Sequence, residues 1–299
     1  MASAVGAQTF MLTGSLFAPA REVHELADCY FYHVTELPGY GIVGNQWDLR
    51  GGEEAYLGDV SFQGKRVLEI GTASGFLCHH MERRGAEVIG FDLAADRSYD
   101  LIPFAGFDIS SLRARWQGFA EKLKNSWWLA HRVFASRARA LYGNIYDIPE
   151  ELGQVDLSTF GAVLLHLRDP FQALASACRL TRETVIVTEV HPEQPDGSGL
   201  GSFLPRPATT AFGRWLRRAR AYSCQGLLHP GRVYFVPQPG ETNTDNVISW
   251  WSFPPEVISR FLGVLGFTTE AVTEHFQVYY GKKNRLYTVV AKRARPPAR

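Results

Sequence analysis

The hydrophobic residues in the middle of the chain recur in two alternating patterns. Short apolar runs have the length and composition of buried strands, and they lie at residues 66–70, 87–92, 154–167 (with the turn that follows) and 184–190. Between them, apolar residues return every three or four positions, as in helices that bury one face, at residues 76–84, from Pro170 onward behind the N-cap Asp169, and at 254–265. Two further strands are predicted near 268–279 and 285–291. Strands that alternate with helices in this way predict an α/β domain with a mainly parallel sheet.

Some parts of the chain depart from this alternation. Residues 1–60 are aromatic and irregular, and are predicted to form an N-terminal extension or cap. The main domain is predicted to span residues 61–299. Lid-like insertions are expected near residues 97–140 and 191–250, because segments of this length usually form lids or binding loops.

The two insertions contain residues whose role the pattern leaves open. Residues 110–142 carry three Trp among many Lys and Arg, and they are predicted to form two helices that break near Asn125. Trp127 and Trp128 open the second of these helices and either line a pocket or belong to the core. A basic helix predicted at 210–221 either contacts phosphate or is solvated surface.

The composition excludes several classes of protein. Of the 299 residues 45% are hydrophobic, and 31 Lys and Arg against 30 Asp and Glu leave a net charge of +1, which gives no support to nucleic-acid binding. The four Cys lie far apart without a C-x-x-C pair, so neither a disulfide framework nor a metal site is expected. No apolar stretch reaches the length of a membrane span. These features predict a cytoplasmic protein.

The strongest local signal is the sequence Leu-Glu-Ile-Gly-Thr-Ala-Ser-Gly-Phe at residues 68–76, where a predicted strand turns into a helix. Small residues let the backbone approach a ligand and point N–H groups at it. Asp92 ends the next strand, 21 residues after Gly71, where an acid accepts the ribose hydroxyls of a nucleoside. Phe76 replaces the third glycine of a dinucleotide fingerprint, and no Gly-Lys-Ser/Thr follows. The unit therefore predicts a nucleoside site; a strand–turn–helix without a ligand is the alternative.

In this turn an acid is followed by any residue and then by a glycine. This order resembles the first motif of class I S-adenosylmethionine-dependent methyltransferases. Ala73 replaces the middle glycine of that motif. The resemblance implies that Glu69, the acid of the turn, helps to hold the ammonium group of the methionine tail. The resemblance implies S-adenosylmethionine as cofactor. It also implies a Rossmann-like three-layer sandwich with a mainly parallel seven-stranded sheet and an insertion after strand five.

A second string, Leu-His-Leu-Arg-Asp-Pro at residues 165–170, is similar to the branch that contains the tRNA wobble-uridine methyl- and carboxymethyltransferases. Members of this branch also have an aromatic N-terminal segment with a Trp, and Trp47 takes that place here. The resemblance implies that Tyr32, Trp47 and Arg50 reach over the methionine tail. Carboxymethylating members place a Tyr before the His, where this chain has Leu165, so plain methyl transfer is expected.

In these enzymes the adenine lies beside a short segment before the fourth strand, and residues 143–149 are similar to it. The Asn144 amide is expected to meet the adenine edge, while Ile145 or Tyr146 packs on its face. The full set of expected cofactor-binding residues is Tyr32, Trp47, Arg50, Glu69, Gly71, Thr72, Ala73, Asp92, Leu93, Asn144, Ile145 and Leu164.

Methyl transfer from a sulfonium is an in-line displacement that sometimes needs a base. His166, after the fourth strand, is the candidate catalytic residue, because imidazole titrates in the useful range; bracing the turn beside Asp169 is the equal alternative. Glu189 is expected to accept hydrogen bonds from loop amides, and His191 to be a loop residue.

Three functions are consistent with these residues. The first is a methyltransferase that acts on an O or N, or an S or C, nucleophile of a small molecule in specialised metabolism. The second is an RNA base methyltransferase, which would use the basic helix as a phosphate track. The third is a non-catalytic relative that binds the cofactor. The near-neutral charge and the aromatic insertion favour the first, with no membrane partner; the acceptor and the oligomeric state are not predicted.

Overall fold

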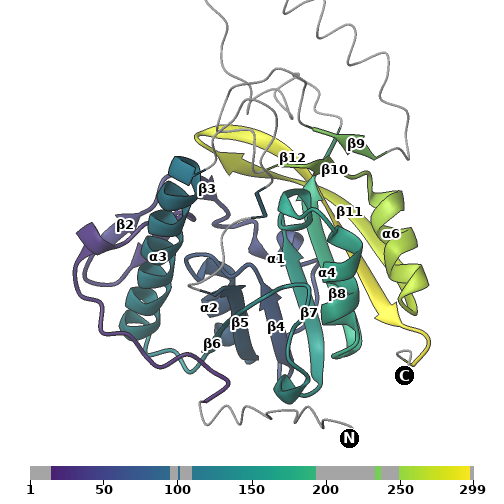
Figure 1. The fold of residues 1–299 in the computed structure, drawn as a ribbon, viewed down its shortest axis with the longest axis horizontal. Helices are drawn as coiled ribbons and strands as arrows, with labels where there is room; N and C mark the ends of the chain where they lie inside the picture. Colours follow the sequence, from purple (N-terminus) through teal and green to yellow (C-terminus); the bar gives the residue numbers. More distant parts are fainter. Residues whose placement is uncertain (1–14, 95–99, 102–109, 193–232, 237–248, 297–299) are drawn as a thin grey trace, which may run out of the picture.

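The computed structural model describes residues 15–94, 100–101, 110–192, 233–236 and 249–296. Within these residues an eight-stranded sheet forms the centre of the molecule (Figure 1). Its strands, in the order in which they lie side by side, are β3 (Trp47–Asp48), β11 (Phe267–Tyr279), β12 (Lys282–Arg293), β8 (Thr181–Val190), β7 (Val155–Gly161), β4 (Arg66–Ile70), β5 (Glu87–Leu93) and β6 (Arg139–Gly143).

The strand pairing agrees with a mainly parallel sheet. The run from β8 through β7, β4 and β5 to β6 is parallel throughout, and only β12, β11 and β3 add antiparallel pairs. The sheet contains the seven strands that the resemblance implies, six of which were located in the sequence, and the short strand β3 adds an eighth at the edge. The carboxyl ends of β4, β5, β7 and β8 therefore meet along one side of the sheet, which is where a ligand binds in an open parallel sheet.

Helices cover both faces of the sheet (Figure 1). One face carries α1 (Glu53–Tyr56), α2 (Phe76–Arg83) and α3 (Ser110–Val133), and the other carries α4 (Pro170–Cys178) and α6 (Pro255–Val264). Each face has its own apolar core, because the strands of a parallel sheet are buried on both sides. The remaining elements of the described residues are short. They are the 3-10 turns η1 (Leu26–Asp28), η2 (Glu150–Leu152) and η3 (Leu164–His166), and the antiparallel pairs β1 (Thr35–Leu37) with β2 (Gly41–Val43) and β9 (Tyr234–Phe235) with β10 (Trp251–Ser252).

Apart from α3 and β6, the main elements were predicted within a few residues. The N-cap is confirmed, since the Asp169 carboxylate accepts a hydrogen bond from Gln172 N at 2.9 Å with Pro170 in the first turn. None of the helices in the described ranges is long and apolar enough to cross a membrane.

The prediction of two helices broken near Asn125 is wrong. Residues 110–133 form the single helix α3, and the Asn125 side chain points outward to donate to Asp28 O at 3.0 Å instead of interrupting the backbone. The helix ends before Ala135, whose φ of +49° is left-handed. Trp127 and Trp128 consequently lie in the second half of α3, are 1% and 4% exposed, and belong to the core. The basic helix predicted at 210–221 lies outside the described residues.

Candidate active site

The glycine turn follows β4 at the carboxyl side of the sheet and is fixed to the neighbouring strand. Gly71 N and Thr72 N both donate to Phe91 O of β5, at 2.9 and 3.2 Å. Gly71 has a φ of +75°, and a Cβ built there would lie 2.5 Å from Cγ2 of Val163. Only glycine avoids both the left-handed strain and this overlap. The turn therefore passes directly beneath the loop that follows β7.

Ala73 occupies the middle of the turn at a φ of +49°. This is a left-handed conformation, which explains why the family motif has a glycine here and which costs alanine about 1 kcal/mol. The conformation points Ala73 N at the Oδ2 of Asp92, at 3.0 Å. The departure from the motif is therefore accommodated without a change in the direction of the turn.

Asp92 brings a carboxylate next to the turn from the last part of β5. Its Oδ1 accepts a hydrogen bond from Leu93 N at 2.8 Å, and its Oδ2 accepts the one from Ala73. A carboxylate has about four acceptor positions, so two remain for the paired hydroxyls of a ribose. Burial raises the pKa of Asp92, and the two backbone N–H donors counteract that rise. The residues present thus fit the sugar of a nucleoside.

Glu69 lies on the inner side of the same turn and is only 5% exposed. Thr72 Oγ1 donates to its carboxyl at 2.6 Å, and Trp127 Nε1 of α3 in turn donates to Thr72 Oγ1 at 3.1 Å. Burial is the main cause that raises the pKa of Glu69 to about 8. The buried position therefore favours the neutral form of this carboxyl.

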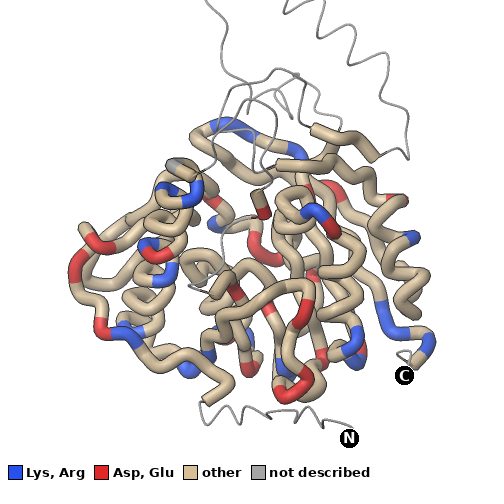
Figure 2. The backbone as a smooth tube through the Cα atoms, in the orientation of Figure 1, with Lys and Arg blue, Asp and Glu red and all other residues tan. Residues whose placement is uncertain are grey.

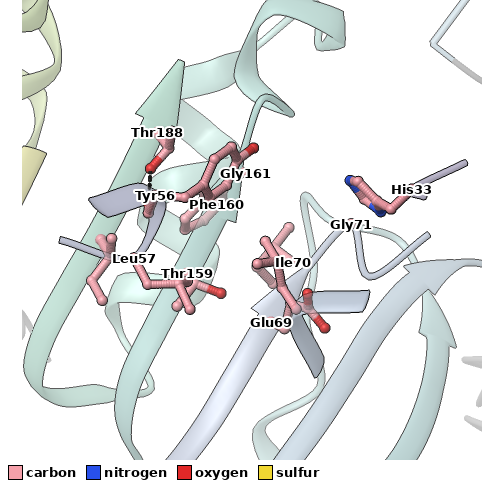
Figure 3. A pocket seen from close by; sticks show the side chains of 12 residues that line it. His33, Tyr56, Leu57, Glu69, Ile70, Gly71, Thr159, Phe160, Gly161 and Thr188 are labelled. Carbon is pink, nitrogen blue, oxygen red and sulfur yellow. Dashed lines mark hydrogen bonds between the residues drawn. The ribbon is translucent and has the colours of Figure 1, made fainter. Parts of the chain in front are cut away.

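A small cavity opens between this turn and the N-terminal segment (Figure 3). His33 lies on one side and Tyr56 on the other, with Glu69 of β4 between them. The cavity has a volume of about 20 Å³, which is room for about one water molecule. His33 is 9% exposed, and its Nδ1 has no hydrogen-bond partner among the described residues. The complete lining is His33, Tyr56, Leu57, Glu69, Ile70, Gly71, Leu77, Thr159, Phe160, Gly161, Ile186 and Thr188.

His33 and Tyr56 were missed from the sequence because neither lies in a recognised motif. Their backbone positions are set by contacts far apart in the chain: His33 N contacts Ser74 Oγ of the glycine turn at 3.4 Å, and Tyr56 O accepts from Thr188 Oγ1 at 2.6 Å. The aromatic run at residues 30–33 was the available signal.

The other N-terminal candidates fall into two groups. Tyr32 and Trp47 lie together, since Trp47 Nε1 donates to the Tyr32 hydroxyl at 3.1 Å. Arg50 lies apart from them on the surface, where it pairs with the Asp48 carboxylate through Nε at 2.8 Å and Nη2 at 2.7 Å.

The segment expected to lie beside the adenine directly follows β6 at the same side of the sheet. Ile145 is 8% exposed, and the Asn144 side chain accepts from Tyr146 N at 3.2 Å. The Tyr146 hydroxyl bonds to the Asp100 carboxylate, which fixes its ring. Leu93 is half-buried beside Asp92, whereas the Leu164 side chain is fully buried in the core.

The loop after β7 holds the candidate base. His166 is half-buried at the end of η3, with its Nδ1 3.5 Å from Ser249 Oγ. Glu189 of β8 supports this loop, since its Oε1 accepts a hydrogen bond from Leu164 N at 2.8 Å. This confirms the prediction that Glu189 accepts hydrogen bonds from loop amides. Burial raises the pKa of Glu189 to about 8. His191 follows β8 and pairs with Glu274 at 3.5 Å.

A second small cavity lies beyond the carboxyl end of β8. It also has a volume of about 20 Å³, and its lining is mostly apolar: Leu165, Glu189, Val190, His191, Trp251, Ser252 and Phe253. Since Leu165 precedes His166, this cavity adjoins the loop with the candidate base.

Comparison with known proteins agrees with this geometry. A family model described as a methyltransferase domain matches residues 53–235, and the chain belongs to that family. The expectation of an S-adenosylmethionine-dependent methyltransferase with a Rossmann-like class I fold is thereby confirmed. No curated protein matches the sequence.

Solved methyltransferase structures are matched at low identity. Magnesium protoporphyrin IX methyltransferase from Synechocystis PCC 6803, with bound S-adenosylhomocysteine, is 14% identical over 82% of this chain and 81% of that chain, with a TM-score of 0.45. The 1,6-didemethyltoxoflavin N1-methyltransferase from Burkholderia thailandensis is 14% identical over 82% and 78%, with a TM-score of 0.46.

Proposed function

We propose that this chain transfers a methyl group from S-adenosylmethionine to an oxygen or nitrogen atom of a small molecule. The observation that carries the proposal is the Asp92 carboxylate, which is bonded to the Ala73 amide of the turn and keeps two acceptor positions for a ribose. This arrangement suits a nucleoside cofactor without phosphate, because Phe76 replaces the third glycine of a dinucleotide fingerprint and no Gly-Lys-Ser/Thr follows.

The residues divide the work of binding. The Asp92 carboxylate holds the sugar, Ile145 packs against the base, and the amino-acid end lies between the glycine turn and the N-terminal segment. When bound, the cofactor supplies an electrophilic methyl group on a positively charged sulfur. The protein itself orients the two reactants and excludes water.

The N-terminal extension acts as a cap in this proposal. Tyr30 N donates to Ser126 Oγ of α3 at 2.7 Å, and His33 N contacts Ser74 of the turn. These contacts hold the segment against the carboxyl side of the sheet, where Tyr32 and Trp47 cover the amino-acid end of the cofactor.

The acceptor is a small, largely apolar molecule that enters near the second cavity. Its lining by Leu165, Trp251 and Phe253 favours apolar groups, and few polar groups orient a ligand in such pockets. His166 beside it takes the proton when the acceptor atom is a hydroxyl or an ammonium nitrogen. Positive and negative segments are interspersed along the described backbone (Figure 2), whereas RNA binding favours a continuous basic track.

The test compares acceptors of both classes. The enzyme is incubated with S-adenosylmethionine and either a panel of small phenols, amines and hydroxy acids or total tRNA, and formation of S-adenosylhomocysteine is measured at low and high salt. We expect turnover with a small molecule that changes little with salt, because no phosphates are bound. Turnover with tRNA alone that falls steeply with salt would contradict the proposal. His166→Ala should slow turnover without weakening cofactor binding.

A further inference from the structure

Asp100 connects three loops at the carboxyl side of the sheet. Its carboxylate accepts hydrogen bonds from Arg168 in the loop after β7, through Nε at 2.5 Å and through the backbone N at 2.8 Å. The same carboxylate accepts a hydrogen bond from the hydroxyl of Tyr146, which follows β6. The Asp100 carbonyl oxygen accepts from Trp250 Nε1, just before β10, at 3.0 Å. Side chains from three separate parts of the chain therefore meet at this one residue.

Each of these loops carries a different part of the candidate active site. Tyr146 belongs to the segment that is proposed to lie beside the adenine. Arg168 follows the candidate base by two residues. The backbone N of Trp250 donates to Leu165 O at 2.8 Å, and Leu165 lines the second cavity. Asp100 thus lies where the cofactor's base, the candidate base and the proposed acceptor cavity are joined.

The bonding at Asp100 differs from that of an ordinary surface ion pair. Its side chain is only 12% exposed, and the bond from Arg168 N fixes the main chain of the loop as well as a side chain. Hydrogen bonds between Arg and a carboxylate are stronger than those between neutral groups, whereas fully exposed pairs contribute little. The Tyr146 hydroxyl also accepts from Asp169 N at 3.2 Å. The loop after β7 is therefore attached to the adenine segment at two successive backbone positions.

We propose that Asp100 is a positioning residue, which holds the loop after β7 and the segment at Trp250 in place against the adenine segment. It acts through Arg168 and Tyr146, and it contacts neither the methyl donor nor the acceptor. The proposal rests on the proposed function, because it needs a nucleoside base bound beside Tyr146. Its consequence is a coupling between the two sites: a bound cofactor stabilises the acceptor cavity, and a bound acceptor stabilises the cofactor to the same extent.

The coupling follows from what the bonds at Asp100 hold together. When they open, Tyr146 loses the partner that fixes its ring, and the adenine loses part of its binding surface. A ligand that binds the joined arrangement better than the open one makes opening rarer. At a ligand concentration ten times its Kd, opening becomes at most about tenfold rarer. Backbone amides that exchange through this opening then exchange more slowly.

Hydrogen exchange with and without S-adenosylhomocysteine measures this coupling. The segments to follow are residues 164–169, which carry the candidate base, and residues 249–253, which are not among the expected cofactor contacts. In the unaltered protein we expect the ligand to slow exchange at least threefold in both segments. Calorimetry gives the Kd of each variant, so that all proteins are compared at the same saturation.

Two variants break the connection at different points. Asp100→Ala removes the acceptor of all three side-chain and backbone donors, and Tyr146→Phe removes a single hydroxyl and keeps the ring. Both should bind S-adenosylhomocysteine no more than fivefold more weakly than the unaltered protein. The ligand should no longer slow exchange at residues 249–253 in either variant. Because Tyr146→Phe is the smaller change, it tests the proposal even where Asp100→Ala folds poorly.

Asp156→Ala is the matched control. The Asp156 carboxylate is also largely buried, and it also accepts from one backbone N, that of Arg66, and from one Arg side chain, that of Arg182. It lies at the opposite end of the sheet from the glycine turn. Its removal should speed exchange locally and leave the slowing by the ligand at residues 249–253 unchanged.

The outcomes separate this inference from the proposed function. A merely structural role of Asp100 would speed exchange equally with and without the ligand, so that slowing by the ligand persists in Asp100→Ala and Tyr146→Phe. That result, or binding to the unaltered protein without slowing at residues 249–253, would overturn the positioning role and leave the nucleoside site intact. Failure of the unaltered protein to bind S-adenosylhomocysteine would overturn the proposed function itself.

Discussion

At the residue scale, Gly71 is a tightly constrained position of the site. Its left-handed φ of +75° and the nearby Val163 side chain each disfavour any larger residue. The two effects are separable, because one belongs to the backbone and the other to a contact between side chains. Ala73, two residues on, shows that the backbone effect alone is tolerated in this chain.

Gly71→Ala should lower the free energy of unfolding by about 2–3 kcal/mol, from backbone strain and overlap together. Val163→Ala removes Cγ2, so the double variant should recover the part that is due to overlap. A double-mutant cycle by urea unfolding measures this coupling. Strictly additive effects of the two substitutions would show that the overlap is relieved in another way.

At the element scale, the turn η3 depends on a carboxyl from a neighbouring strand. Leu164 N donates to Glu189 Oε1, and the amides of Val163 and Leu165 also act on this carboxyl. The loop that carries His166 is thus held from β8, and its Leu165 lines the second cavity.

Glu189→Ala should leave these buried amides without an acceptor and lower the free energy of unfolding by about 2 kcal/mol. Hydrogen exchange of the amides at residues 163–165 should become faster, and His166-dependent turnover should fall. Glu189→Gln, which keeps an acceptor oxygen, is the matched control and should be milder. Unchanged exchange in Glu189→Ala would show that the carboxyl does not hold the turn.

The same scale shows how far the sequence predicts the structure. Apolar runs locate β4 and β5 closely, because central parallel strands are buried on both faces. The edge strand β6 was missed, since its run is short and begins with Arg139, and it was included in a predicted helix. Asn125 gave a false break, because its half-buried side chain bonds to Asp28 O of the N-terminal segment and leaves the helical backbone intact.

The residues of the candidate site also fall into those that the sequence locates and those that only the structure brings together. Gly71 and Asp92 were found because the strand–turn–helix–strand order fixes them by spacing. His33 and Tyr56 meet Glu69 only through contacts between distant segments, which a single sequence does not reveal. Whether Arg50 and His166 take part in binding and catalysis stays a prediction.

At the scale of the whole molecule, buried ionisable groups link stability to pH. Glu69 and Glu189 have folded-state pKa values near 8, above those of the unfolded chain. Their contribution to the free energy of unfolding is fully present below the pKa of the unfolded chain, and it is lost as pH rises toward 8. His33 and His275, with folded pKa values near 4, contribute in the opposite direction, and their contribution is complete above pH 6.5.

Between pH 6.5 and pH 8 the free energy of unfolding should therefore decrease, because the unfolded chain binds fewer protons there than the folded one. Urea unfolding at several pH values measures the slope. Glu69→Gln should reduce it, and Glu69→Gln with Glu189→Gln should reduce it further. A slope that is the same in all three proteins would contradict the assignment of these protons.

The central claim is that the turn after β4 and the carboxylate of Asp92 together grip a nucleoside. Calorimetric titration of S-adenosylhomocysteine into the intact protein and into Asp92→Ala tests it most directly, with Asp156→Ala as control, since Asp156 accepts from Arg66 N at the start of β4, the opposite end from the turn. The account predicts one binding site per chain, affinity at least tenfold weaker in Asp92→Ala, and unchanged affinity in Asp156→Ala. Equal affinity in all three proteins, or no binding by the intact one, would contradict it.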